Sequence, residues 1–187
     1  MKPRLLGIFA TLVIVIAVTA WLQNTAEPPR QQAPALTTKH TVDFYMESYD
    51  ATVMNDEGKP SHRIISPKLV HYSDDDTSEL DSPYMTIYRE QGNPWQITSK
   101  RGWVAAKNEH ILLSGDVVLN RKKSPVNEAM VMKTERLRIR PDDEYAETDT
   151  KVTMDAEKQH TVAHGMRAYM AKGQIQLLDK VRTRYEK

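Results

Sequence analysis

The side chains best suited to chemistry are two histidines, His160 and His164, which lie four residues apart near the C-terminus. On a helix this spacing would place both imidazoles on one face, where they could bind zinc. No HExxH glutamate accompanies them, and the surrounding segment has the pattern of a strand or loop. We therefore interpret them as exposed polar residues.

Other charged clusters also lack the spacing of a known site. The acidic groups at 74–76 and 142–144 could bind calcium, but neither matches the DxDxDG pattern with a distal glutamate, which favours solvated turns. The basic run 121–123 could contact phosphates or anionic headgroups, with a solvated loop as the alternative. There is no GxSxG, P-loop or GxGxxG motif. We expect no catalytic site, no metal site, no cofactor and no enzyme activity.

The charge and cysteine content of the chain exclude further classes of function. The chain has 187 residues, a formal net charge of +1 and no cysteine, a length that suits one medium domain with an appendage. Residues 1–22 carry Lys2 and Arg4 and no acid, so the rest of the chain is close to neutral. A near-neutral body argues against nucleic-acid binding. The lack of cysteine excludes disulfides and thiol catalysis.

An uncharged apolar segment, residues 5–22, predicts a single transmembrane helix of roughly 27 Å. Basic residues precede it, so the positive-inside rule places residues 1–4 in the cytoplasm and everything after the segment on the far side. Residues 23–40 contain a proline-rich stretch that predicts a tether to a domain at 41–187.

A cleaved signal peptide is the alternative interpretation of the N-terminus. Val18-Thr19-Ala20 offers a small-residue cleavage site. Against this, the apolar run is longer than the usual signal-peptide core of about 7–15 residues. Both interpretations export the domain.

From residue 41 onward the pattern predicts an all-β sandwich, barrel or roll, because short β-rich runs alternate with polar turns such as Ser114-Gly115-Asp116. A weak repeat of about 30 residues, with Val117, Val152 and Val181 in equivalent places, indicates hairpins stacked along an axis; unrelated hairpins are the alternative. The predicted strands are 42–47, 51–54, 62–66, 68–72, 84–89, 95–99, 110–114, 116–120, 136–140, 151–155 and 175–178.

Stacked hairpins have a functional consequence. The period-2 alternation of strands puts apolar side chains on one face, so walls that do not close fully would leave an apolar groove. An open end of the stack would also expose backbone groups that can pair with a strand of another chain.

In several segments the chain resembles the LptC family of lipopolysaccharide-export proteins. The matching segments are His62-Arg63-Ile64-Ile65, Pro83 to Tyr88, Pro94-Trp95, Leu112 to Val117 and, most specifically, Leu178 to Glu186. The order of these segments behind one transmembrane segment distinguishes this family from the soluble bridge protein LptA, which has a cleaved signal peptide. The same comparison favours the uncleaved anchor.

The resemblance implies an OstA-like β-jellyroll of two facing antiparallel sheets, held in the periplasm of a Gram-negative envelope by one inner-membrane helix. Its implied role is to accept lipopolysaccharide from the inner-membrane ATP-driven (ABC) transporter complex and pass it to LptA. The N-terminal edge would pair with a transporter jellyroll and the C-terminal edge with LptA. A membrane-tethered adaptor without lipid in its core, and an exported enzyme with dispersed carboxylates, are the alternatives.

Two sets of residues would carry this role. For lipid binding, the expected groove-lining residues are Ile64, Leu69, Leu80, Ile87, Ile97, Leu113, Val117, Leu119, Ile139, Val152, Met154, Ile175 and Leu177. For partner binding at the C-terminal edge, the expected residues are Lys180, Val181, Arg182, Thr183, Arg184 and Tyr185.

Overall fold

The structure is a computed structural model that describes residues 40–89, 92–125 and 127–186. The predicted cytoplasmic tail (1–4), transmembrane helix (5–22) and most of the tether (23–40) lie outside the described residues. No helix within those described residues has the length and apolarity to cross a membrane. The elements are β1 (Val42–Met54), β2 (Pro60–Tyr72), β3 (Thr77–Asp81), β4 (Tyr84–Ile87), β5 (Trp95–Thr98), β6 (Arg101–Val104), a 3-10 helix η1 (Ala106–Asn108), β7 (Ile111–Arg121), β8 (Met130–Arg140), β9 (Tyr145–Ala156), β10 (Gln159–Tyr169) and β11 (Gln174–Tyr185).

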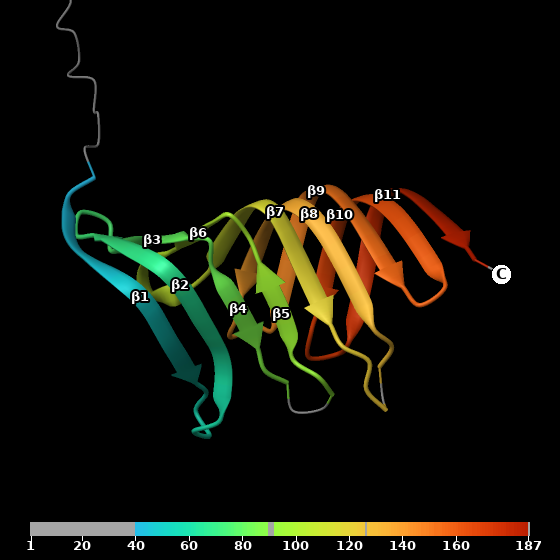
Figure 1. Cartoon of the computed structure of the whole chain (residues 1–187), viewed down its shortest axis with the longest axis horizontal. Helices are drawn as coiled ribbons and strands as arrows, with labels where there is room; N and C mark the ends of the chain where they lie inside the picture. The colour runs from blue at the N-terminus through green and yellow to red at the C-terminus, as the bar shows by residue number, and fades with distance from the viewer. Residues whose placement is uncertain (1–39, 90–91, 126, 187) are drawn as a thin grey trace, which may run out of the picture. The chain divides into compact units, whose positions relative to one another are not determined.

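All strand pairings are antiparallel, and all except β2–β4, β3–β6 and β5–β7 join strands that are consecutive in the chain. The first half of β2 pairs with β4 and its second half with β3. In the same way β7 pairs with β6 and then with β5. Thus β3 and β4 together take the place of one long strand that is interrupted in the middle, and β5 and β6 take the place of another. The whole sheet is a meander that begins at β1 and ends at β11 (Figure 1).

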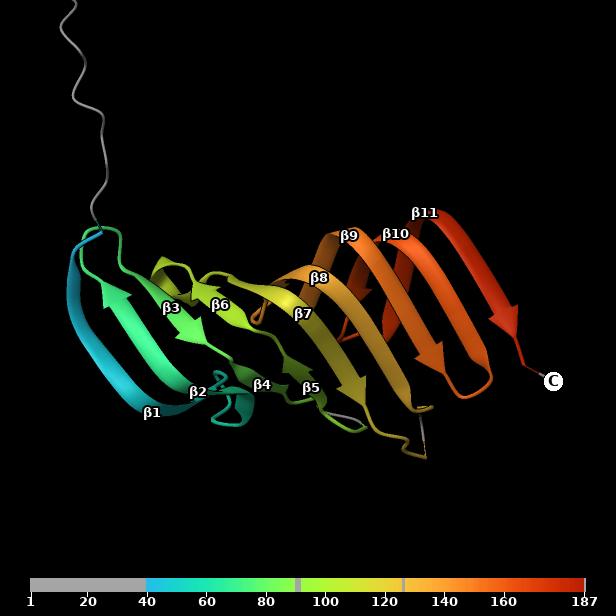
Figure 2. The same ribbon diagram turned by 45° about the horizontal axis from the view of Figure 1, so that its top comes forward.

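Each long strand bends near its middle, so the sheet folds into two facing walls (Figure 2). The β3–β6 wall contains those two strands and the halves of the long strands that pair beside them; the β4–β5 wall contains the other halves. We call the line of bends the seam and the opposite side, where the hairpin turns lie, the mouth. The expected all-β jellyroll of two facing antiparallel sheets is confirmed, with strands that run continuously from one wall to the other.

Hydroxyl side chains hold the seam together. Ser99 Oγ donates to the carbonyl of Arg101 at 2.9 Å, and Ser66 Oγ lies 2.7 Å and 2.6 Å from the carbonyls of Lys68 and Asp81. Thr134 Oγ1 lies 3.0 Å from the carbonyl of Lys151. These hydroxyls satisfy backbone groups where the ladder is interrupted, at residues that are themselves buried.

The bends also need unusual backbone angles. Gly115 and Gly165 have φ of 78° and 81°, where a Cβ would approach Lys100 Cβ and Leu178 Cδ1 to 3.0 Å. Val117 and Val181 directly follow the positive-φ residues Asp116 and Lys180. The predicted equivalence of these two valines therefore matches a structural equivalence, since each is the first residue after a bend.

The sequence analysis divided several strands incorrectly. The predicted pairs of strands 42–47 with 51–54, and 62–66 with 68–72, are the two halves of β1 and of β2. Ser114-Gly115-Asp116 is a bend within β7 and not a turn between strands. The error arises because a positive-φ glycine beside an aspartate is also the chemistry of a hairpin turn.

Removing a seam hydroxyl should weaken the fold. We expect Thr134→Val to lower the free energy of unfolding by about 1–3 kcal/mol. The valine keeps the side-chain volume but removes the hydroxyl, so the buried groups that bond it are left without a hydrogen-bond partner. Urea unfolding measures this. Thr86→Val is the matched control, since the half-buried hydroxyl of Thr86 has no hydrogen bond within the described residues. Equal losses for both variants would contradict a special role for the seam.

Stability should also depend on pH through His62, a buried residue of β2 near the mouth. Burial lowers the pKa of His62 below its ordinary value of 6.5, and the nearby charge of Asp142 only partly opposes this. The unfolded chain therefore binds the proton first, so stability is full above pH 6.5 and is lost as the pH falls below it. The carboxylates whose pKa values are lowered affect stability only at more acidic pH, below their ordinary pKa values of 3.8 to 4.5. We expect His62→Gln to flatten the stability profile between about pH 6.5 and 5; a slope equal to that of the wild type would exclude His62 as its source.

Candidate functional site

The space between the walls brings together all thirteen residues predicted to line a groove. Ten of them belong to the buried core, and Met154, Ile175 and Leu177 are partly buried and pack against it. They come from both walls, with Leu69, Leu80 and Leu113 on the β3–β6 wall and Ile97, Val117 and Leu119 on the β4–β5 wall. In this structure the middle of the interior is filled by these side chains.

The interior also contains residues that sequence reasoning missed. Seven of these eleven residues are methionine or alanine, which do not distinguish strand from helix as valine and isoleucine do. The burial of β8 and β10 alternates with a period of two residues, and this alternation was the pattern that could have identified the missed residues on these strands. The missed residues are Met85, Trp95, Val104, Ile111, Met132, Leu137, Ala146, Ala163, Met166, Ala168 and Met170.

The interior is not covered at its β1 end. Met46 pairs with Leu69, and Phe44 pairs with His71 and stacks on its ring with centroids 4.6 Å apart. Because Leu69 points into the core, Met46 and Phe44 face the same side. Both are nevertheless exposed, since no strand follows β1 on its other side within the described residues.

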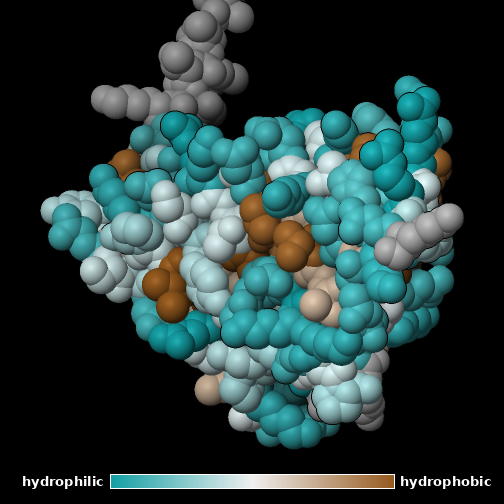
Figure 3. All heavy atoms as spheres, turned by 45° about the vertical axis from the view of Figure 1, so that its right-hand side comes forward, coloured by the Kyte–Doolittle hydropathy of each residue, from teal (hydrophilic) through white to brown (hydrophobic). Residues whose placement is uncertain are grey.

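The β11 end is open in the same way. Ile175 and Leu177 pack against the core from the first half of β11, and Thr183 in the second half bonds the buried Thr161 through their hydroxyls at 3.0 Å. Val181 shares the side of Thr183 and is 48% exposed. Figure 3, which brings the C-terminal side forward, shows hydrophobic side chains in the middle of a hydrophilic face.

The predicted partner-binding residues 180–185 form the second half of this edge strand. They pair with β10 on one side only, and all are exposed. Lys180 has a φ of 50° and its N–H bonds the carboxylate of Asp179 at 2.8 Å, which sets the bend of β11. Within residues 40–89, 92–125 and 127–186, no strand pairs with the outer side of this edge.

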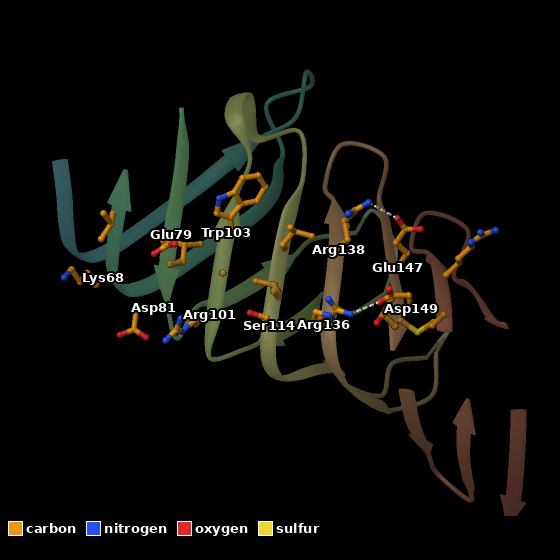
Figure 4. A pocket seen from close by; sticks show the side chains of 18 of the residues that line it. Lys68, Glu79, Asp81, Arg101, Trp103, Ser114, Arg136, Arg138, Glu147 and Asp149 are labelled. Atoms are coloured by element: carbon orange, nitrogen blue, oxygen red, sulfur yellow. Dashed lines mark ion pairs between the residues drawn. The ribbon is translucent and has the colours of Figure 1, made fainter. Parts of the chain in front are cut away.

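A hollow lies on the outer face of the β3–β6 wall, with a cavity volume of about 980 Å³ (Figure 4). We call it the outer hollow. Its charged side chains alternate along the strands with core residues, as Arg136 and Arg138 do with the buried Leu137. Arg136 pairs with Asp149, and Arg138 with Glu147, each at 3.7 Å. These ion pairs share the lining with apolar side chains, among them Val70, Trp103, Leu112 and Leu178, so the hollow has a mixed polar and apolar surface.

The histidines considered as metal ligands do not form a shared metal site within the described residues. His160 and His164 lie on β10, where four residues span about 13 Å, too far for one shared ion; His160 Nδ1 contacts the carboxylate of Asp155. His40 Nδ1 lies 3.2 Å from Asp74 and 3.6 Å from Asp75 on the exposed surface.

Arg121 differs from the expected solvated loop. It is the last residue of β7, is buried, and stacks its guanidinium on Trp95 with 4.8 Å between the guanidinium carbon and the ring centroid. Only Lys122 and Lys123 of the basic run are exposed, and Lys123 pairs with Glu128 and Glu157. The alternation of β7 would have predicted the burial, had the strand been extended by one residue.

Comparisons with known proteins agree with this geometry. A family described as "Lipopolysaccharide-assembly, LptC-related" matches residues 9–186. A similar solved structure is LptH of Pseudomonas aeruginosa, described as the LptA-homologous periplasmic component of the lipopolysaccharide transport device; the TM-score is 0.54 at 7% identity, over 67% of this chain and 95% of that one. At this identity the likeness shows the fold alone. No curated protein matches.

The family match covers nearly the whole chain, including most of the predicted membrane segment and the complete roll. It agrees with a bent-strand fold whose interior is apolar and whose two edge strands have no second neighbour in the part of the chain that the structure describes. The chain belongs to the LptC-related family of lipopolysaccharide-assembly proteins.

Proposed function

We propose that this protein is a non-enzymatic carrier in lipopolysaccharide export. It accepts lipopolysaccharide from the inner-membrane ABC transporter, holds the acyl chains between its walls, and passes them to an LptA-type bridge protein paired at its C-terminal edge. Residues 5–22 anchor it in the inner membrane, and the roll is periplasmic. Membership of the LptC-related family supports this role.

The observation that carries the proposal is where the exposed apolar side chains lie. Within the described residues, every large hydrophobic residue that is exposed belongs to one of the two edge strands. On β1 these are Val42, Phe44, Tyr45, Met46 and Met54, and on β11 they are Leu178, Val181 and Tyr185. An apolar interior that ends at two exposed apolar edges is suited to continuation in another roll at each end.

Edge pairing supplies both affinity and alignment. The outer side of β1 and of β11 carries backbone N–H and C=O groups without a neighbouring strand among the described residues. A strand of a partner roll would satisfy them and extend the sheet, so that its interior continues the interior of this one. The basic residues Lys180, Arg182 and Arg184 on β11 discourage pairing with copies of itself.

The energetic need for such a path is large. Several acyl chains exposed to water cost on the order of tens of kcal/mol, at about 25 cal/mol per Å² of apolar surface. The interior must therefore make room for them. Methionines suit this task, because their thioether side chains repack easily. Met85, Met132, Met166 and Met170 lie in the core, and Met130 and Met154 pack against it.

A tethered adaptor that carries no lipid is the second candidate. The filled interior favours it, since Ile97, Val117 and Ile139 have no exposed surface in this structure. The two functions differ in whether the purified full-length chain retains lipopolysaccharide. Retention supports the carrier; its absence, with an unaltered fold, supports the adaptor.

A charge at the open end of the interior should reduce lipid retention. We expect Ile175→Asp to lower the lipopolysaccharide bound by the full-length chain about tenfold or more, because a carboxylate beside acyl chains must be desolvated. Gln176→Asp is the matched control, because the adjacent side chain is exposed on the opposite face. Lipid binding and circular dichroism should be measured on both variants; equal retention would place the acyl chains elsewhere.

Removing the C-terminal edge should separate the two partners. We expect deletion of residues 180–187 to abolish co-purification with an LptA-type protein, because the pairing edge and its apolar side chains are lost. Co-purification with the transporter should persist, since β1 is untouched. Loss of both partners, or of neither, would show that the edges are assigned incorrectly.

A further inference from the structure

Three buried donors without a partner gather at one place in the fold. Among the described residues, the buried side-chain atoms that lack a hydrogen-bond partner are Arg89 Nη1, Trp95 Nε1 and Arg121 Nε. Trp95 pairs with Ile87 on one side and with Arg121 on the other, and Arg89 follows Ile87 by two residues. Trp95 and Arg121 therefore face the interior from one rim of the β4–β5 wall, and Arg89 follows the end of β4 at the same rim.

Among the described residues, no carboxylate pairs with Arg121. It is only 6% exposed, and Trp95 is 3% exposed. Its Nη2 donates to the backbone carbonyl of Glu128 at 3.3 Å, while the carboxylate of Glu128 pairs with Lys123 at 3.1 Å. A buried guanidinium that lacks an anionic partner is costly, so an anion at this place would be strongly favoured.

Arg89 adds a second positive charge to the same place. Burial and the charge of Arg89 both lower the pKa of Arg121. The Nη2 atom of Arg89 would lie 3.6 Å from a Cβ placed on Gly173, in the turn between β10 and β11. That turn belongs to the rim of the β3–β6 wall, so Arg89 reaches across the mouth.

We propose that Arg89, Trp95 and Arg121 form a phosphate-binding site at the mouth of the roll. Two guanidinium groups and an indole N–H supply donors that lack partners, and a phosphate offers enough acceptor oxygens for all of them. Two sources share this chemistry: a phosphate of the lipopolysaccharide headgroup, and free phosphate. The first rests on the proposed function, because a lipid with its chains between the walls would present its headgroup at the mouth.

The decisive experiment compares lipopolysaccharide with its dephosphorylated form. Affinities of the full-length chain for both lipids are measured for the wild type, Arg89→Gln, Arg121→Gln and the control Arg101→Gln, which removes an exposed arginine from the outer hollow. We expect the wild type and the control to prefer the phosphorylated lipid by about tenfold. Arg89→Gln and Arg121→Gln should lose this preference and bind the dephosphorylated lipid as the wild type does.

A second measurement identifies the source of the phosphate. The thermal unfolding temperature of each variant is followed with inorganic phosphate and with chloride at equal ionic strength. A phosphate-specific increase in the wild type that is absent in Arg89→Gln supports the site. Because Arg89 is half-buried and Arg121 fully so, Arg89→Gln carries the test if Arg121→Gln does not fold.

The outcomes separate the site from the carrier function. If both lipids bind the wild type equally and phosphate does not raise its unfolding temperature, the phosphate site is excluded and the carrier function stands. If phosphate stabilises the wild type but neither lipid binds, the site stands with free phosphate as its source and the carrier function fails. Equal weakening of both lipids by Arg89→Gln would mean that Arg89 has only a structural role.

Discussion

The structure depends on one constraint: every long strand must cross from one wall to the other without leaving buried backbone groups unpaired. Residues with positive φ, such as Gly115 and Gly165, turn the chain at the seam, and buried hydroxyls such as that of Thr134 bond the carbonyls that the ladder leaves free. Given these bends, a simple meander becomes two facing walls with one apolar interior. Without them, the same strands would form a flat sheet with one side of its core exposed to water.

A folded meander does not close, and its function follows from that. A barrel removes its edges by pairing the first strand with the last, but here β1 and β11 stay at opposite ends of the sheet. Each end leaves a free backbone edge beside apolar side chains such as Phe44 and Val181. In a solitary protein this arrangement would invite aggregation. In the proposed chain of similar rolls this arrangement would be the means of assembly, and it would make the interior continuous from one protein to the next.

The sequence was sufficient for the fold class and for about half of the buried core, because both depend on period-2 alternation. All thirteen proposed lining residues lie in the core or against it, since valine, isoleucine and leucine mark a strand face clearly. It was not sufficient for the bends, because Gly115-Asp116 has the same local chemistry in a hairpin turn as in a bent strand. Nor did it reveal the burial of Arg121, because the predicted strand 116–120 stopped one residue before the end of β7. The alternation of β7 continues to Arg121, but an arginine is not expected at an inward position unless the packing of its guanidinium on Trp95 is known.

The central claim is that acyl chains travel between the walls. Photo-crosslinkers placed at alternating positions test it most directly, in membranes that contain the transporter, ATP and lipopolysaccharide. The inward positions Leu119 and Ile175 are compared with their outward neighbours Val118 and Gln176. The account predicts ATP-dependent crosslinks to lipopolysaccharide from the inward positions only. Crosslinks from the outward positions alone, or from none of the four while the transporter is active, would contradict it.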